Sequence, residues 1–407
     1  MSHTPLHLRP FSARTSVLMA ALLLGLAACG GGGGDAPSDG GSTGSGGSGG
    51  STGSGGSTGS GGSTGGGSSG GSTGGSGSGG GSTGGAGTGS GQVGVPAAGQ
   101  AVDTSAPDRV VGTGTPASCT SAAVVNAVAQ GGKIRFNCGP NPVTIPMTST
   151  AKVFNNKPDV TLDGQGLITL DGGGARRILY QNTCDQAQVW TSANCDNQET
   201  PRFTVQNMRF ANGNSTGDLT DGGGGGAIFV RGGQFKIVNS VFTNNRCESS
   251  GNDIGGGAVR VLAIYQERPV YVVQSTFGGA AGLGNSCSSG GALSTIGVSY
   301  SIYNSLFTHN TATGRLPSPG GGNGGAIATD GNTYSLSIYG SVVSDNTAVE
   351  GGSAVFFVSN NLTGRVTLSD SQFVRNAASK FGTAGLPGMF IQAGAGQPVV
   401  TNSAISY

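Results

Sequence analysis

The sequence carries little charge. Only 10% of its 407 residues are Asp, Glu, Lys or Arg, aromatic residues make up 6%, and the formal net charge is +1. Proteins that bind nucleic acid through its phosphates need a clear excess of positive charge, so we expect no nucleic-acid partner. Glycine is abundant instead, with 83 residues unevenly spread, so the chain is best considered segment by segment.

The first segment has the features of an export signal. Arg9 and Arg14 precede a short apolar run, Val17 to Ala28, that is too short to cross a bilayer comfortably as a helix. The run ends in Leu26-Ala27-Ala28-Cys29, which resembles the lipobox of bacterial lipoproteins. That resemblance implies a signal peptide over 1–28, lipidation of Cys29, and, from Gly30, sorting to the outer membrane. The alternative is an ordinary signal peptide with an unrelated cysteine.

Residues 29–92 consist of Cys29 followed almost entirely by Gly, Ser and Thr. Such a segment cannot bury apolar surface, so we expect a disordered, flexible tether. About 60 such residues have a mean end-to-end distance of roughly 45 Å. The tether would connect a membrane anchor to a folded module.

Two interleaved repeats define that module. The first is an aliphatic residue, any residue, usually Asn, then Ser, any residue and a large apolar residue. Its seven copies are Val205 to Phe210, Ile237 to Phe242, Val272 to Phe277, Ile302 to Phe307, Ile338 to Val343, Leu368 to Phe373 and Val400 to Ile405. The second is Gly-Gly-Ala followed by an aliphatic residue. Its copies begin at Gly225, Gly256, Gly290, Gly324 and, in degenerate form, Gly352.

A repeat of roughly 32 residues with period-two alternation and no helical period is typical of a β-solenoid coil. We therefore predict an all-β, right-handed parallel β-helix of about 8–9 coils over 151–407. Equivalent side chains should stack about 4.8 Å apart. The aliphatic positions would then form an interior column, and Asn239, Asn304 and Asn402 would form an amide ladder at a bend.

Residues 93–150 should form an N-terminal cap. Ser121 to Ala129 has helical composition, with Thr120 or Ser121 able to cap the helix and Gly131 to end it. A strand is expected over Lys133 to Phe136. A solenoid needs such a cap to cover its open end.

Cysteine usage fits an exported chain. There are seven cysteines, and setting Cys29 aside for the lipid leaves six, enough for three bridges in an oxidising compartment. Cys247 and Cys287 each follow an Asn in matching turns of neighbouring coils, where Cα atoms should lie near disulfide distance. By proximity in sequence we also pair Cys119 with Cys138 and Cys184 with Cys195.

The alternation of Gly-Gly-Ala-[Ile/Leu/Val] with Phe-x-x-Asn (Phe242 to Asn245, Phe307 to Asn310, Phe373 to Asn376) resembles the polymorphic outer membrane protein repeat. The stretch VTLDGQGLITLDGGGARRILY, from Val160, resembles the first coils of pectin-lyase-like β-helix proteins. These resemblances imply the β-helix fold and a surface, adhesive role. The sequence ends at Tyr407 without that family's translocator barrel, so we expect the lipid to serve as the anchor.

The pectin-lyase-like superfamily also includes polysaccharide lyases and hydrolases, and glycoside hydrolysis usually needs two nearby carboxylates. Arg231 and Asp330 share an outward column but lie three coils apart, too far to cooperate. His309, the one histidine outside the signal, is interpreted as a turn residue. We therefore predict no catalytic residue and no bound cofactor.

Calcium is the remaining metal possibility. Asp218, Asp221 and Asp253 precede successive Gly-Gly-Ala motifs and could share one Ca²⁺ through oxygen ligands. Solvated loop residues are the alternative that we favour. Asp163 and Asp171, each before a Gly, are interpreted as turn residues. Three arginines could meet a sugar acid or simply be surface charges: Arg176, Arg177 and Arg260.

The resulting hypothesis is a lipid-anchored cell-envelope module, without enzymatic activity, that binds polysaccharide or a protein on a host or neighbouring cell. The alternatives are a polysaccharide lyase or hydrolase, and a structural envelope protein with no specific ligand. We expect an outer-membrane lipoprotein that is exposed at the cell surface or faces the periplasm.

Overall fold

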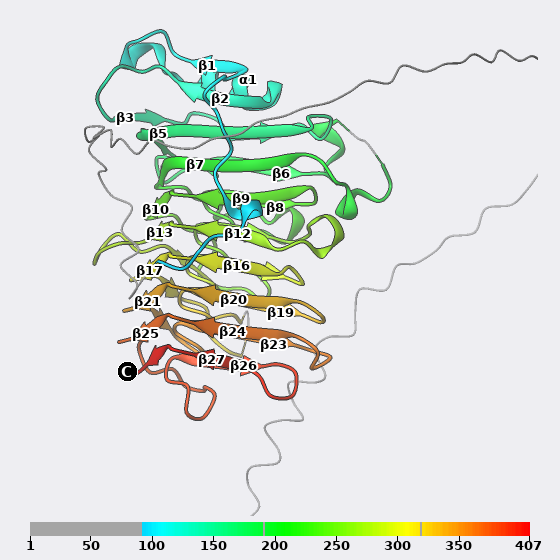
Figure 1. The fold of residues 1–407 in the computed structure, drawn as a ribbon, viewed down its shortest axis with the longest axis vertical. Coiled ribbons are helices and arrows are strands. Elements are labelled where there is room, and N and C mark those ends of the chain that lie inside the picture. Colours follow the sequence, from blue (N-terminus) through cyan, green and yellow to red (C-terminus); the bar gives the residue numbers. More distant parts are fainter. Residues whose placement is uncertain (1–91, 190–191, 318–319) are drawn as a thin grey trace, which may run out of the picture. The chain divides into compact units, whose positions relative to one another are not determined.

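Alternating apolar residues put one side of every strand into a shared interior. The computed structural model describes residues 92–189, 192–317 and 320–407, and the predictions about Cys29, the signal peptide and the tether lie outside them. Its strands pair in parallel, coil upon coil, through three long columns (Figure 1). The third column has eight strands. The predicted all-β parallel β-helix is confirmed.

A complete coil contributes to all three long columns, and the first and last turns contribute to fewer. The first column contains β1 (Arg109–Val111), β2 (Gly132–Phe136), β5 (Asp159–Asp171), β7 (Arg202–Ala211), β9 (Gln234–Val238), β12 (Val270–Val273), β16 (Tyr300–Tyr303), β20 (Ser335–Tyr339), β24 (Arg365–Ser369) and β27 (Val399–Thr401). The long strands β5 and β7 continue into the second column. Its other members are β3 (Val143–Pro146), β10 (Val241–Thr243), β13 (Thr276–Phe277), β17 (Leu306–Thr308), β21 (Val342–Ser344), β25 (Gln372–Val374) and β28 (Ala404–Ile405).

The third column follows the Gly-Gly-Ala motifs. It contains β4 (Ala151–Val153), β6 (Leu179–Asn182), β8 (Ile228–Arg231), β11 (Val259–Val261), β15 (Leu293–Ile296), β19 (Ile327–Gly331), β23 (Val355–Ser359) and β26 (Met389–Gln392). A short fourth column contains β14 (Ser286–Cys287), β18 (Thr311–Ala312) and β22 (Thr347–Ala348).

Helices are short and peripheral. α1 (Ser121–Gln130) caps the N-terminal end, as predicted: the Thr120 hydroxyl accepts from the Ala123 amide at 3.2 Å, and Gly131 ends the helix with a φ of 71°. Strand β2 follows it at the predicted place. The 3-10 turns are η1 (Ala97–Gly99), η2 (Pro116–Ser118), η3 (Gln186–Gln188), η4 (Cys195–Asn197), η5 (Thr220–Gly222) and η6 (Tyr265–Glu267).

The repeats stack in the predicted register. Ile237, Val272 and Ile302 pair directly across β9, β12 and β16, and the column continues through Ile338 and Leu368. All five side chains are fully buried. Beside them, the rings of Phe210, Phe242, Phe277 and Phe307 stack with centroids 4.7–4.9 Å apart. The repeat therefore sets the core.

The repeat serine has a specific partner. From Ser275 onward, each repeat serine accepts, through its hydroxyl, a hydrogen bond from the backbone amide of the equivalent serine in the preceding coil, at 3.0–3.1 Å. The ladder comprises Ser240, Ser275, Ser305, Ser341, Ser371 and Ser403. A hydroxyl at this position satisfies a buried backbone donor that would otherwise be unpaired.

The predicted ladder at the bend is present only as separate rungs. Asn239, Asn304 and Asn402 adopt positive φ values of 45°, 50° and 44° there; Asn239 and Asn402 donate to the equivalent residues of the preceding coil, Asn207 and Asp370, whereas Asn304 donates to Val93. A continuous ladder lies elsewhere, at the Asn of the Phe-x-x-Asn motifs and at the equivalent positions of the other coils. Its links, 2.9–3.0 Å long, join Asn245, Asn285, Asn310, Asn346 and Asn376. All five of these asparagines are buried.

Three cysteine pairs lie at bonding distance, with the partners expected from the sequence. The Cα–Cα distances are 5.7 Å for Cys119–Cys138, 5.0 Å for Cys184–Cys195 and 4.8 Å for Cys247–Cys287. The last pair links neighbouring coils next to the Asn ladder, where Asn245 and Asn285 bond directly.

Candidate functional site

A groove of about 890 Å³ runs along the outer face of the first column. Its floor consists of side chains that point outward from five successive coils. In register they are Lys133, Thr161, Thr204, Lys236 and Tyr271. Because neighbouring strands are about 4.8 Å apart, this floor presents one polar or aromatic group per coil at a regular spacing.

The groove is cationic. Lys157 and Arg268 stand at its sides and join Lys133 and Lys236 on its floor. Among the described residues, none of these four side chains forms an ion pair. Arg202 also lines the groove, but Asp159 holds its guanidinium at 2.8 Å. Asp108 also lines the groove and Asp103 acts electrostatically on Lys133, but the four cations outnumber these two carboxylates and form no ion pair with them.

One wall of the groove is the segment 93–108, which we call the arm. In Figure 1 the arm runs in blue across the front of the first column, against the direction of coil growth, from the level of β16 to the cap. Ala98, Val102 and Asp108 of the arm line the groove.

Side chains of the β-helix hold the arm by its backbone. Asn304 accepts from the amide of Val93 at 2.9 Å and donates to its carbonyl at 2.8 Å. In the same way, Gln206 accepts from the amide of Val102 at 2.8 Å and donates to its carbonyl at 2.9 Å. The Lys236 ammonium donates to the carbonyl of Gln100 at 2.6 Å, and burial lowers the pKa of this lysine.

Asp163 secures the next part of the arm. Its carboxylate accepts from the Thr104 hydroxyl at 2.6 Å, from Gln206 at 3.0 Å and from Asn207 at 2.9 Å. Burial acts to raise the pKa of Asp163, but the hydrogen bonds from Thr104, Asn207 and Gln206 outweigh it and lower the pKa overall. The predicted turn role holds in part, since the Gln165 amide donates to Asp163 at 2.9 Å.

The outer face of the third column carries the arginines that the sequence singled out. Arg177 and Arg260 are not surface charges: they are 5% and 1% exposed. The segments 218–225 and 253–256 cover them, because glycines there let the backbone approach the sheet closely. A Cβ on Gly224 would lie 2.8 Å from Cδ of Arg260. Arg176, the third candidate, is half-buried and donates to the carbonyl of Thr148.

The three carboxylates considered as possible calcium ligands do not come together. Asp218 pairs with Arg177 at 2.6 Å, and Asp221 pairs with Arg231 at 3.2 Å. Asp253 is exposed in the next loop. Among the described residues, these three do not form a group whose oxygens could share an ion. Their places reflect the neighbouring arginines, which the sequence pattern alone did not reveal.

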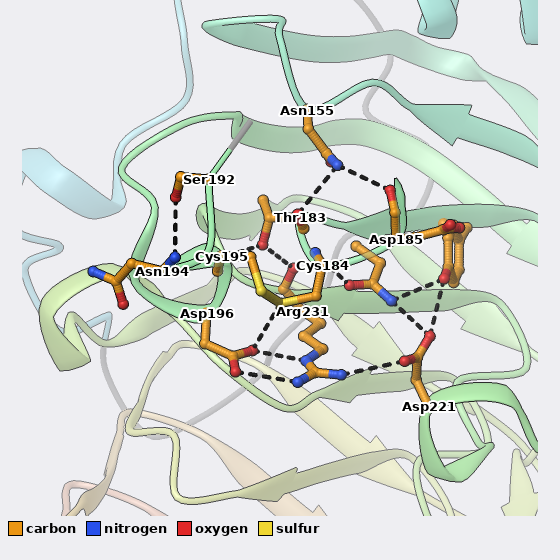
Figure 2. Close-up of a disulfide and its surroundings, with 12 residues drawn as sticks. Asn155, Thr183, Cys184, Asp185, Ser192, Asn194, Cys195, Asp196, Asp221 and Arg231 are labelled. Atoms are coloured by element: carbon orange, nitrogen blue, oxygen red, sulfur yellow. Dashed lines mark hydrogen bonds and ion pairs between the residues drawn. A yellow bond between two sulfur atoms is a disulfide. The ribbon is translucent and has the colours of Figure 1, made fainter. Parts of the chain in front are cut away.

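Figure 2 shows the charge network around the Cys184–Cys195 disulfide. Asp196 receives two hydrogen bonds from Arg231, at 2.7 and 3.1 Å, and Arg231 continues to Asp221. The structure brings both cysteines and Asp196 together, the one such group with metal-binding spacing in the described ranges. Both sulfurs are bonded to each other, so they are not free thiolate ligands.

The remaining candidates have local roles. His309 occupies a turn with a φ of 61° and contacts the Thr308 hydroxyl at 2.8 Å, in keeping with its interpretation as a turn residue. Asp171 accepts from the Gly173 amide at 2.7 Å, as a turn residue does. Arg231 and Asp330 do lie three coils apart in one column.

The sequence reasoning missed the cationic groove. The cations of the groove are scattered between positions 133 and 268 and match no motif. The signal that could have revealed them is register: Lys133 and Lys236 occupy the same outward position of their coils. The arm was also missed as a groove wall, since its sequence shows no period.

Within the part of the chain that the structure describes, no helix has the length and hydrophobicity needed to span a membrane. Comparison of the chain with family models, with curated proteins and with solved structures found no match in any of the three.

Proposed function

We propose that this chain is a lipid-anchored cell-envelope protein whose β-helix binds an acidic polysaccharide without cleaving it. The observation that carries the proposal is the cationic groove over the first column. It combines the outward ring of Tyr271 with cations that form no ion pair in the described part of the chain. Few, well-placed polar groups in a concave site are typical of ligand recognition.

The spacing of the charges suits an extended ligand. Lys133 and Lys236 stand three coil steps apart, roughly 14 Å along the axis. Lys157 and Arg268 lie beside them in the same groove. A polymer with a carboxylate on successive sugars could meet several cations at once, whereas a small monosaccharide could meet one or two. Charge complementarity of this kind favours an acidic chain over a neutral one.

Binding is better supported than cleavage. Asp218 and Asp221, two neighbouring carboxylates beside the third column, are already engaged by arginines. The observation that most favours cleavage is Asp330 on β19, a half-buried carboxyl group outside the groove lining whose pKa is raised by burial. A lyase or hydrolase acting on the same polymers is therefore the second candidate function.

The anchor and location rest on the sequence. The lipobox-like Leu26-Ala27-Ala28-Cys29 and the Gly/Ser/Thr tether support attachment to the outer membrane. The resemblance to polymorphic outer membrane proteins supports a surface role, with a polysaccharide or a protein of a neighbouring cell as the partner.

The test is binding of the purified full chain to a panel of acidic and neutral polysaccharides, measured by calorimetry, with product analysis by chromatography. We expect binding to acidic polymers only, weakening as salt rises because exposed charges are screened. Replacing both Lys133 and Lys157 with Ala should weaken binding about tenfold or more, at roughly 1 kcal/mol per lost contact.

The matched control is Arg365→Ala. Arg365 is an exposed cation of the first column, on β24, outside the groove lining. The Arg365→Ala variant should bind acidic polysaccharides as tightly as the unmodified chain does. Equal loss in the control, or binding to neutral polymers alone, would contradict the groove assignment. Shortened products would favour the hydrolase or lyase, and no binding at all would favour a purely structural envelope protein.

A further inference from the structure

Arg260 is a buried cation with unused donors. The side chain projects outward from β11 yet is 1% exposed, because the glycine-rich segment before β8 covers it. Its Nε and Nη1 are buried and have no hydrogen-bond partner. Burial also lowers the pKa of Arg260, to about 10. Leaving a charged group both desolvated and unpaired is strongly unfavourable, so such an arrangement calls for an explanation.

Arg177 provides the comparison within the same structure. It is buried beside the same glycines, but each of its nitrogens has a partner: Nε donates to the carbonyl of Gly225 at 3.1 Å, Nη1 to Asp218 at 2.6 Å and Nη2 to the carbonyl of Gly224 at 2.9 Å. The two guanidinium groups repel each other. Of these two buried cations, only Arg177 is paired with a carboxylate of the described chain.

Space is available next to the unpaired guanidinium. A Cβ built on Gly222 would lie 3.7 Å from Nη2 of Arg260, and it would meet no other heavy atom within 4 Å. Gly222 itself is exposed. The nearest balancing charge is Asp253, whose field acts on Arg260, but it does not form an ion pair with it among the described residues.

We propose that Arg260 binds a small monovalent anion in the space beside Gly222. An anion there would accept from Nη2, the guanidinium nitrogen that faces this space. Its negative charge would offset the positive charge of Arg260, on which the unbonded Asp253 acts only electrostatically. The surrounding glycines offer no side chain that could fill the space in its place. This site is separate from the polysaccharide groove, which lies on a different column.

Chloride is the probe, and thermal unfolding of the full chain is the measurement. Chloride would replace gluconate at constant ionic strength. An anion that binds the folded state raises the unfolding midpoint, here by about 2–4 °C once chloride exceeds its Kd about tenfold. Arg260→Gln should lose this rise. Arg365→Gln, the exposed control on β24, should keep it.

A second variant covers the case in which Arg260→Gln does not fold. Asp253→Asn removes the carboxylate that partly offsets Arg260, so chloride should bind severalfold more tightly and the midpoint should rise at lower chloride. The inference is overturned by a midpoint that ignores chloride, by an equal rise in Arg260→Gln, or by an unchanged chloride dependence in Asp253→Asn. Water alone would then occupy the space.

Discussion

At the scale of single residues, the interior is specified by polar side chains as much as by apolar ones. The Ser and Asn ladders run beside the phenylalanine stack, and each member satisfies a buried backbone group of a neighbouring coil. The Asn310 amide, for example, donates to the carbonyl of Phe277 and to Asn346. Because one side chain serves two coils, the loss of one rung affects both.

Asn310→Ala tests this role. The substitution leaves the backbone amide of Asn285 without its acceptor, removes one of the two acceptors of the Asn285 side chain, and leaves the Phe277 carbonyl without this donor. Buried groups without partners cost about 1–3 kcal/mol each, so the free energy of unfolding should fall by roughly 3 kcal/mol. Urea unfolding measures the change.

Asn402→Ala is the control, since Asn402 is also an asparagine but is exposed at the bend. It should cost well under 1 kcal/mol. Equal losses in the two variants would show that the ladder has no special weight.

The sequence predicted which aliphatic positions face the interior but not which asparagines do. The ladder was assigned to Asn239 and not to Asn245 because both asparagines lie near a bend, and only the path of the backbone separates them. Arg260 was interpreted as either a contact for a sugar acid or a surface charge because it points outward from its strand. Its burial depends on a loop without periodic pattern, so the sequence carried no signal for it.

At the scale of elements, the arm is the least expected feature. The cap helix and its first strand were predictable from capping residues and alternation. The arm has neither signal, and its position depends on side chains as distant in sequence as Asn304. Its attachment through Asp163 gives it a dependence on pH.

Because the pKa of Asp163 is lower in the folded state, its ionised form stabilises the docked arm. That contribution is complete above the unfolded value of about 3.9 and is lost as the pH falls through the folded value. We expect the Val102 amide, bound by Gln206, to lose protection from hydrogen exchange in that acidic range. The Val93 amide, held by the uncharged Asn304, should change less.

Asp163→Asn serves as the control for this effect. With no carboxylate to titrate, its Val102 protection should be lower throughout and flat between pH 5 and 3. A variant that kept the acid-dependent loss would assign the effect to another group.

At the scale of the whole molecule, register decides what is predictable. A repeat that places Ile237, Val272 and Ile302 in direct contact fixes the architecture, and the structure bears it out. The groove arises from the same register, applied to outward positions where the sequence is free to vary. The fold could therefore be predicted from the repeats, whereas the candidate site could be recognised only in the three-dimensional structure.

The proposed lipid anchor determines where the whole chain is located. If Cys29 carries the lipid, Cys29→Ser should move the protein from the membrane fraction to the soluble fraction, measured by fractionation and immunoblotting. A distant pair, Cys247→Ser with Cys287→Ser, should leave fractionation unchanged. Membrane association that survives the loss of Cys29 would rule out the lipid anchor.

The arm also decides how the β-helix would respond to mechanical load. Tension arriving through residue 92 would enter beside β16, midway along the stack, and not at the cap. The bonds to Asn304, Lys236, Gln206 and Asp163 would break one after another, releasing about 55 Å of chain before any coil is pulled. The arm would therefore detach before the coils unfold, and the stacked core would stay intact.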